Sequence, residues 1–544
     1  MADFKNISGN IVDVVSKKIF KGEITVKNGK IESVKESDTS SENFIIPGFI
    51  DSHLHVESSM LIPSEFARIA VTHGTIGAVS DPHEIANVLG VDGVYFMIKN
   101  GKKVPFKFYF GAPSCVPATS FESSGANISS NEIKVLLADN DVHYLAEMMN
   151  FPGVVYDDVE VWEKLKAAKN ANKVVDGHAP GLKGANLEKY VKAGVSTDHE
   201  CFTIEEGLEK IELGMKILIR EGSAAKNFDD LIDLIKDYPQ HIMLCSDDKH
   251  PDDLIKGHIN LLVKRALDIG YDVFDVLRSV TLNPKQHYNL DNGLLQVGDN
   301  ADFVIVDNLQ SLNILETFIN GIRVAENGKT LIKNVEEKPI NKFECNKLSA
   351  SDLKVPAESN KIKVIEVIDG QLITKRTSEI VQPKKGFVDA DISKDILKIV
   401  VLNRYSRSLP SIAFIRGFGL KKGAIASTIA HDSHNIIAVG TNDEDLANAI
   451  NLLIDARGGI SFACNEENDV LPLPFAGLMS GEDVYVVANK YETIDRKAKG
   501  LGSTLISPFM TLSFMALLVI PEIKISDKGL FDGEKFEFIS LFDK

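Results

Sequence analysis

The pattern of apolar and polar residues changes twice along this chain of 544 residues. In residues 1–44, apolar and polar positions alternate, as in Glu23-Ile24-Thr25-Val26, and Asn28-Gly29 supplies a tight turn before another alternating run. This pattern predicts a small antiparallel sheet. From about residue 45 to residue 288, short apolar runs are separated by helical stretches, which is typical of strand-helix units and a parallel sheet.

Eight short apolar runs can be counted in residues 45–288, and each is a predicted strand. The strands are expected to end near His55, Asp81, Pro113, Asn150, His178, His199, Glu221 and Asp248. Apolar residues at helical spacing predict helices between them, including 158–170 and 228–238, the second closed by Pro239. Eight strand-helix units in about 245 residues match the size of a (β/α)8 barrel.

After Tyr288 the sequence returns to β character, with turn residues at 298–300 followed by an apolar run. We expect residues 289–335 to join residues 1–44 in a β-sandwich domain that flanks the barrel. Residues 336–360, rich in Lys, Glu, Ser, Asn and Pro, are typical of a linker. Residues 361–544 predict a C-terminal α/β domain, with strands at 398–402, 411–415 and 435–439 and helices at 443–456 and 508–518. The expected fold class is α/β, a (β/α)8 TIM-like barrel with two further domains.

Composition narrows the range of partners. A net charge of -17 argues against a nucleic-acid backbone or an anionic membrane, because both attract clustered Lys and Arg. Five widely spaced cysteines, without a Cys-x-x-Cys pair or a secretory leader, predict free thiols and a cytoplasmic protein. The longest apolar stretch, residues 509–520, is about half of the ~20 residues that span a bilayer, so it predicts a buried core segment.

Candidate metal ligands stand at the predicted strand ends. His53 and His55 are separated by one residue and point the same way from an extended strand. Further ligand-type side chains follow at Glu147, His178, His199 and Asp247. A buried histidine hydrogen-bonded in a core is the usual alternative for any single position. Because active residues of (β/α)8 barrels gather at the carboxyl ends of the strands, the whole set favours a site for one or two divalent ions.

The order of these ligands resembles that of the amidohydrolase superfamily, metal-dependent hydrolases and deaminases on a (β/α)8 barrel with a flanking β-sandwich. Residues 47–51, 281–284 and 298–302 support the resemblance. Finer motifs are similar to those of the microbial adenine deaminase family, and they extend over essentially the whole chain. These motifs are residues 80–87, 146–153, 176–181, 198–200, 245–251, 430–435 and 508–514.

The resemblance implies a pair of divalent ions, with Mn2+ or Fe2+ expected and Zn2+ as the alternative. His53, His55 and Asp247 would hold one ion and His178 and His199 the other. Glu147 would bridge the two ions, where many relatives place a carboxylated lysine. A water molecule shared by the ions would lose its proton near neutral pH, and the resulting hydroxide would attack C6 of adenine, giving hypoxanthine and ammonia.

Roles in proton transfer and base binding are also implied. Asp247 is the first choice for carrying a proton from the water to the leaving amine. Glu200 either protonates a ring nitrogen or orients His199, and the sequence leaves both roles open. Asp248 would contact the imidazole part of the base.

Further residues have two readings each. His83 and Glu84 either line the base pocket or begin a helix. His431 and His434 either belong to a turn or reach the pocket.

Two other functions remain open from the sequence. The runner-up within the superfamily is hydrolysis of a cyclic amide or an N-acetyl group by the same two-metal site. Single-metal pyrimidine and guanine deaminases usually carry His-x-x-Glu at the third histidine, whereas Ala179-Pro180-Gly181 follows His178, which disfavours them. A non-catalytic barrel that senses a metal or a purine is the alternative from a different class. The expected homodimer rests on the family resemblance alone.

Overall fold

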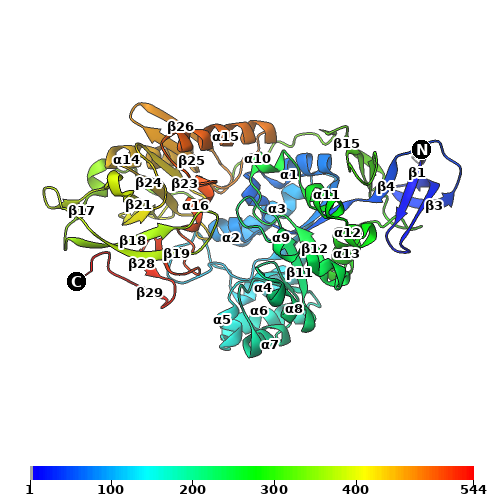
Figure 1. The fold of residues 1–544 in the computed structure, drawn as a ribbon, viewed down its shortest axis with the longest axis horizontal. Coiled ribbons are helices and arrows are strands. Elements are labelled where there is room, and N and C mark those ends of the chain that lie inside the picture. The colour runs from blue at the N-terminus through cyan, green and yellow to red at the C-terminus, as the bar shows by residue number, and fades with distance from the viewer. Residues whose placement is uncertain (1–3, 544) are drawn as a thin grey trace. The chain divides into compact units, whose positions relative to one another are not determined.

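The computed structural model describes residues 4–543, which divide into two compact units (Figure 1). The first unit comprises residues 4–82, 94–114 and 129–336, and the second comprises residues 83–93, 115–128 and 337–543. Two segments between predicted barrel strands, 83–93 and 115–128, therefore group with the C-terminal residues.

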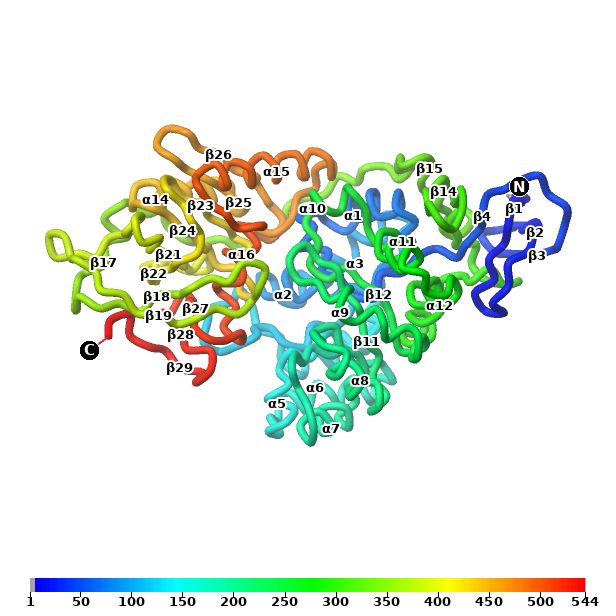
Figure 2. Tube along the Cα trace, in the orientation of Figure 1, coloured from blue at the N-terminus to red at the C-terminus, as the bar shows by residue number. Residues whose placement is uncertain are grey.

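One sheet of the first unit is built from two distant parts of the chain. It contains β1 (Phe4–Asp13), β2 (Lys18–Lys27), β3 (Lys30–Glu36), β4 (Phe44–Pro47), β13 (Phe303–Val306), β14 (Ile314–Ile319), β15 (Ile322–Glu326) and β16 (Lys329–Thr330). Their order is β16-β15-β14-β13-β4-β1-β2-β3, and Figure 2 shows blue β1–β4 beside green β14 and β15. Strand β4 is the junction, because it pairs with β13 on one side and β1 on the other.

The predicted hairpin at Asn28-Gly29 is confirmed, since these two residues connect β2 to β3. Their φ angles are 54° and 76°, in the left-handed region that an Asn-Gly turn accommodates at low cost.

The eight predicted strands of residues 45–288 are present, and each ends shortly before its predicted position. They are β5 (Phe49–Leu54), β6 (Thr75–Ser80), β7 (Lys107–Ala112), β8 (Val142–Met148), β9 (Val175–Gly177), β10 (Thr197–Asp198), β11 (Lys216–Arg220) and β12 (Ile242–Cys245). Strands β5–β9 form one parallel sheet and β10–β12 another. Isolated parallel bridges join Val175 to Val195 and Leu54 to Asp247.

Helices follow these strands in the manner of an α/β protein. The longer ones are α1 (Pro63–Ala70), α3 (Val91–Gly101), α4 (Ser130–Ala138), α6 (Val159–Asn170), α7 (Gly184–Lys192), α8 (Ile204–Glu212), α11 (Ile259–Ile269), α12 (Val273–Ser279) and α13 (Leu282–Tyr288). Every residue of β5 and β6 is buried, as expected for parallel strands covered on both faces.

Helix α6 matches its prediction, and Asp158 caps it by accepting a hydrogen bond from the Val161 amide at 3.0 Å. The predicted helix at 228–238 is only partly correct. The structure has a short α9 (Phe228–Leu231) and then a 3-10 helix, η3 (Ile232–Lys236). Ile232 and Ile235 are both buried, and three residues per turn place them on one face.

The second unit is organised around a mixed sheet of order β19-β18-β22-β21-β24-β23-β25-β26. Its strands are β18 (Lys361–Val367), β19 (Thr374–Ile380), β21 (Leu397–Leu402), β22 (Ser411–Arg416), β23 (Ala424–Ser427), β24 (Ile436–Gly440), β25 (Gly459–Cys464) and β26 (Glu467–Pro472). Three of these are the strands predicted at 398–402, 411–415 and 435–439. Leu446, Ile450 and Leu453 of helix α14 (Asp443–Ala456) pack in one apolar cluster with Leu402 and Ala438 of the sheet.

Further elements of the second unit include α2 (His83–Leu89), α15 (Val484–Gly500), α16 (Pro508–Phe514), the paired short strands β17 (Val355–Pro356) and β20 (Phe387–Val388), and β27 (Ile523–Ser526), β28 (Gly529–Asp532) and β29 (Glu537–Phe538). Most of the apolar stretch that includes α16 is buried, as predicted. None of the helices in residues 4–543 combines the length and the apolar character needed to cross a bilayer. All five cysteines are free thiols.

The junction between β4 and β5 predicts a destabilising substitution. A Cβ atom added to Gly48 would lie 2.4 Å from Cγ2 of Ile76, which is a buried residue of β6. We expect Gly48→Ala to lower the free energy of unfolding by about 1–3 kcal/mol through overpacking. Urea denaturation would measure the loss. The matched control is Gly500→Ala, which meets no atom within 4 Å and should leave stability unchanged or slightly higher. Equal stability of both variants would contradict the expectation.

Candidate metal centre

Six predicted ligands converge at the carboxyl ends of the parallel strands in the first unit. They are His53, His55, Glu147, His178, His199 and Asp247, and all are buried except His178, whose side chain is 19% exposed. Subsets of them bring their ligand atoms within 4.8 Å of one another. The structure therefore brings these six residues together at one place.

The carboxylate of Glu147 is divided between two groups of histidines. Its Oε1 faces His55 Nε2 at 3.4 Å. Its Oε2 lies 2.9 Å from His178 Nδ1 and 3.2 Å from His199 Nε2. One oxygen for each group is the arrangement that a bridging carboxylate needs.

Asp247 approaches the first histidine pair through one oxygen. Its Oδ1 lies 3.6 Å from His53 Nε2 and 3.4 Å from His55 Nε2. The backbone of Asp247 is left-handed, with φ 51°, and its amide donates to the carbonyl oxygen of His53 at 3.0 Å. This backbone contact turns the side chain back toward the histidines.

These distances fit divalent ions better than a hydrogen-bonded cluster. Most exceed the 2.7–3.2 Å of an N–H···O hydrogen bond. Two ligands in adjacent positions on one ion, each with a bond of about 2.1 Å, stand about 3 Å or more apart. Both ring nitrogens of His53 are fully buried and have no hydrogen-bond partner within residues 4–543, which is costly unless an ion takes one of them.

The electrostatic environment differs from one ligand to the next. Burial, reinforced by the neighbouring His199, lowers the pKa of His53 well below its usual value, so its imidazole is neutral. Burial opposes the charged form of Glu147, but the histidines around it, His178 first, hold its pKa well below the usual range. Burial opposes the charged forms of the other three histidines, but the neighbouring carboxylates raise the pKa of His55, His178 and His199 above the usual value. An ion that binds these three imidazoles must therefore displace their protons.

Asp51 connects the first and last strands of the parallel set behind these ligands. Its carboxylate accepts hydrogen bonds from the Ser246 amide at 3.1 Å, the Ser246 hydroxyl at 2.5 Å and the His53 amide at 3.3 Å. His258 Nε2 lies 2.8 Å from the same carboxylate. The contact fixes the backbone of His53 next to the segment that carries Asp247. Asp51 belongs to the motif at residues 47–51, whereas no local pattern marks His258.

A buried lysine holds the loops that carry His178 and His199. Lys210 of α8 donates to the Asp198 carboxylate and, at 2.9 Å, to the carbonyl oxygen of Ala179. Both partners are the immediate neighbours of a histidine ligand. Lys210 lies in an ordinary amphipathic helix, and nothing in its local sequence distinguishes it from a surface lysine.

Arg220, the last residue of β11, joins two carboxylates of the centre and was not predicted. Its Nη1 donates to Glu200 Oε1 and, at 2.6 Å, to Asp247 Oδ2, while its Nη2 donates to Glu200 Oε2 at 2.8 Å. Burial opposes the charge of Glu200, but Arg220 and then His178 hold its pKa well below the usual range. Asp248, the next residue after Asp247, is half-buried and accepts a hydrogen bond from the Ser58 hydroxyl.

Comparison with known proteins identifies the group to which the chain belongs. Residues 44–324 match the amidohydrolase family and residues 371–537 match the adenine deaminase C-terminal domain. An adenine deaminase of Methanosarcina mazei is 54% identical over 99% of both chains, and one of Salinibacter ruber is 52% identical over 99% of both. The chain belongs to the adenine deaminase family.

Among solved structures, a β-aspartyl dipeptidase of Fervidobacterium islandicum AW-1 aligns with 61% of this chain and all of its own, at 15% identity and a TM-score of 0.46. Family membership rests on the full-length relatives rather than on this remote likeness. As a member of the amidohydrolase family, a metal-dependent group, the chain carries groups of residues able to bind metal ions.

The second unit contains a cluster of Glu84, His431 and His434, all buried. Glu84 Oε1 lies 2.6 Å from His431 Nδ1, and its Oε2 contacts His434 Nε2. Because ligands of one ion stand about 3 Å apart, the carboxylate of this cluster is hydrogen-bonded directly to the imidazoles. His434 Nδ1 accepts from the Ala430 amide at 3.3 Å, which assigns the proton to Nε2.

The helix start predicted at His83 and Glu84 is present, since His83 begins α2.

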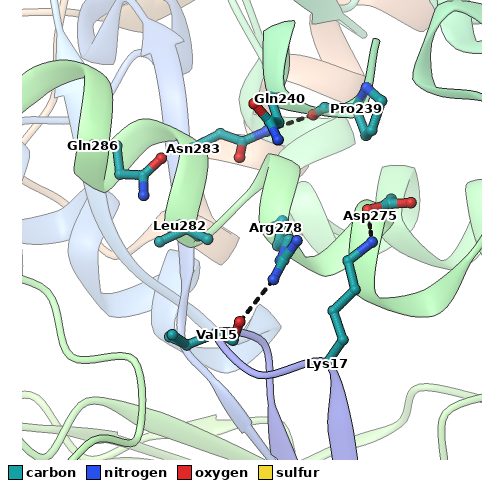
Figure 3. Close-up of a pocket in the computed structure, with 9 residues that line it drawn as sticks. All are labelled: Val15, Lys17, Pro239, Gln240, Asp275, Arg278, Leu282, Asn283 and Gln286. Atoms are coloured by element: carbon teal, nitrogen blue, oxygen red, sulfur yellow. Dashed lines mark hydrogen bonds and ion pairs between the residues drawn. The ribbon is translucent and has the colours of Figure 1, made fainter. Parts of the chain in front are cut away.

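A pocket of about 380 Å³ in the first unit contains none of the predicted site residues (Figure 3). Its cations are engaged locally: Lys17 pairs with Asp275 at 2.6 Å, and Arg278 Nη2 donates to the Val15 carbonyl oxygen at 2.9 Å. These contacts hold the turn between β1 and β2 against α12.

Because the two oxygens of Glu147 face different histidines, the effect of removing the charge of Glu147 can be predicted. We expect Glu147→Gln to fold but to retain about one of two Mn2+ equivalents, because an amide offers one weak oxygen ligand and no charge. Elemental analysis after gel filtration would measure the stoichiometry. The matched control is Glu122→Gln in the second unit, where burial and then Asp432 raise the pKa of a carboxyl that is therefore already neutral. Two tightly bound equivalents in Glu147→Gln would refute the bridging role.

Proposed function

We propose that this protein catalyses the hydrolytic deamination of adenine to hypoxanthine and ammonia at a two-ion site. The observation that carries the proposal is the Glu147 carboxylate, with one oxygen facing His55 and the other facing His178 and His199. Relatives named adenine deaminase, 52–54% identical over 99% of the chain, indicate that the substrate is adenine. The runner-up, a two-ion hydrolase of cyclic amides or N-acetyl groups, has neither support.

The donor set assigns ligands to each ion. His53, His55 and Asp247 would hold one ion, His178 and His199 the other, and Glu147 both. We expect Mn2+ or Fe2+, with Zn2+ as the alternative, because imidazole and carboxylate ligands accept all three. When bound, the ions supply Lewis acidity, which lowers the pKa of water toward neutrality.

The protein's own residues then manage protons and orientation. Water adds to C6 of adenine, and the C–N bond to the amino group breaks as ammonia leaves. Asp247 has one oxygen held by Arg220 and the other directed into the centre, so it can accept the proton of the water and return it to the leaving amine. Both oxygens of Glu200 accept hydrogen bonds from Arg220, which favours an orienting role over protonation of the ring.

Base recognition is assigned to Asp248. Its half-buried carboxylate is oriented by the Ser58 hydroxyl and can accept an N–H of the imidazole part of adenine. Contact of His83 and Glu84 with the base stays a prediction, as do the homodimer and the cytoplasmic location.

The finer architecture is also part of the proposal. The parallel bridges at Val175 and Leu54 support one closed (β/α)8 barrel over residues 45–288. The sheet shared by β1–β4 and β13–β16 supports a flanking β-sandwich domain from residues 1–44 and 289–335. Residues 336–360 would link it to a C-terminal domain of residues 361–544.

Adenine turnover tests the reaction. Purified protein loaded with Mn2+ or Fe2+ should release ammonia from adenine while the ultraviolet spectrum changes to that of hypoxanthine. Removal of the ions with a chelator should abolish release, and readdition should restore it. A folded sample with two metal equivalents that releases no ammonia from adenine would refute the proposal.

Substitution of Asp248 tests base recognition separately from chemistry. We expect Asp248→Asn to raise KM for adenine by about 10-fold or more, since one hydrogen bond to a charged group contributes about 1.5–3 kcal/mol. Both metal equivalents should remain. Steady-state kinetics with metal analysis would measure this, and Asp252→Asn, a carboxylate on the neighbouring helix α10 (Pro251–Leu254), serves as the control. An unchanged KM would contradict the assignment.

A further inference from the structure

Arg220 stands at the meeting point of three neighbouring strand ends. Glu200 follows β10 by two residues, Arg220 ends β11, and Asp247 follows β12 by two residues. Arg220 is 3% exposed, and its guanidinium donates to both carboxylates, including a two-point contact with Glu200. Arg220 is not among the predicted metal ligands, yet it contacts Glu200 and Asp247, the two acidic residues predicted to transfer protons.

The contact with Arg220 separates the two oxygens of Asp247. Oδ2 accepts the hydrogen bond from Nη1 at 2.6 Å, so only Oδ1 is directed toward His53 and His55. Rotation of the carboxylate would exchange the oxygens and break a charge-assisted hydrogen bond in a buried setting. We propose that Arg220 is a positioning residue that makes Asp247 a one-oxygen ligand of the metal centre and holds Glu200 beside the histidines.

The shape of the arginine side chain is essential to this role. A planar guanidinium reaches two carboxylates at once with fixed angles, whereas a lysine ammonium is a point charge on a flexible stem. Glu200 and Asp247 also share one donor atom, Nη1, so their like charges are close together and depend on the cation between them. Replacement of the planar guanidinium should therefore displace both carboxylates, even by a side chain that keeps the positive charge.

The proposal rests on the proposed two-ion deaminase, and its test uses a readout that does not require turnover. Equilibrium dialysis of the full-length protein against Mn2+ should show about 10-fold or greater weakening of one ion in Arg220→Gln. With adenine, kcat should fall about 100-fold while KM changes little, because binding of the base is not altered. The control is Arg323→Gln, an exposed arginine on β15 that pairs with Glu316 and Glu326 and should behave as wild type.

Two outcomes overturn the proposal. The first is an unchanged Mn2+ affinity in folded Arg220→Gln, which would overturn the proposal whatever the kcat of that variant. If Arg220→Gln does not fold, Arg220→Lys is the test, since it keeps the charge but not the planar guanidinium that contacts two carboxylates. That variant should melt near the wild-type temperature with kcat lowered at least about 10-fold, and full activity would overturn the positioning role. Wild-type protein that binds Mn2+ but releases no ammonia would refute the deaminase function alone, because dialysis still tests Arg220.

Discussion

The arrangement of the metal centre depends on the hydrogen bonds to the carboxylate of Asp51. This group is fully buried and accepts from the backbone of His53, from the backbone and hydroxyl of Ser246, and contacts His258. Its partners lie up to 207 positions further along the chain, at the opposite end of the series of strands. A buried carboxylate that lost these partners would bear a large desolvation cost, so folding strongly favours the single register in which His53 and Asp247 are neighbours.

Charge balance gives the centre its chemical character. Two buried carboxylates, those of Glu200 and Asp247, share the guanidinium of Arg220, and a third, that of Glu147, lies among the histidines. Once the imidazoles are neutral, as metal ligands must be, three carboxylates exceed one guanidinium in charge, and divalent cations would offset the difference. Beneath it, Lys210 and Asp198 form a compensated pair, so the support for the ligands adds little to this excess.

The ligands could be predicted from the sequence because each stands at the end of an apolar run, where the period of a strand fixes side-chain direction. The eight parallel strands and α6 followed from the same local patterns. Arg220, His258 and Lys210 could not be predicted, because their roles come from partners 12–207 residues away and their own surroundings are ordinary. The 3-10 helix at 232–236 was missed because its apolar residues also suit an α-helix. Residues 83–93 and 115–128 group with the second unit, and no pattern in their own sequence predicts this grouping.

The sheet shared by β1–β4 and β13–β16 has a consequence for biosynthesis. Strand β4 acquires its antiparallel partner only when β13 has been made, about 250 residues later. At roughly 5–20 residues per second, this delay is about 10–50 s on the ribosome. During that time the apolar edge of β4, all but one of whose residues are buried in the finished fold, is exposed to other nascent chains. The β13 side of β4 therefore stays without its strand partner until all the parallel strands from β5 to β12 have been made.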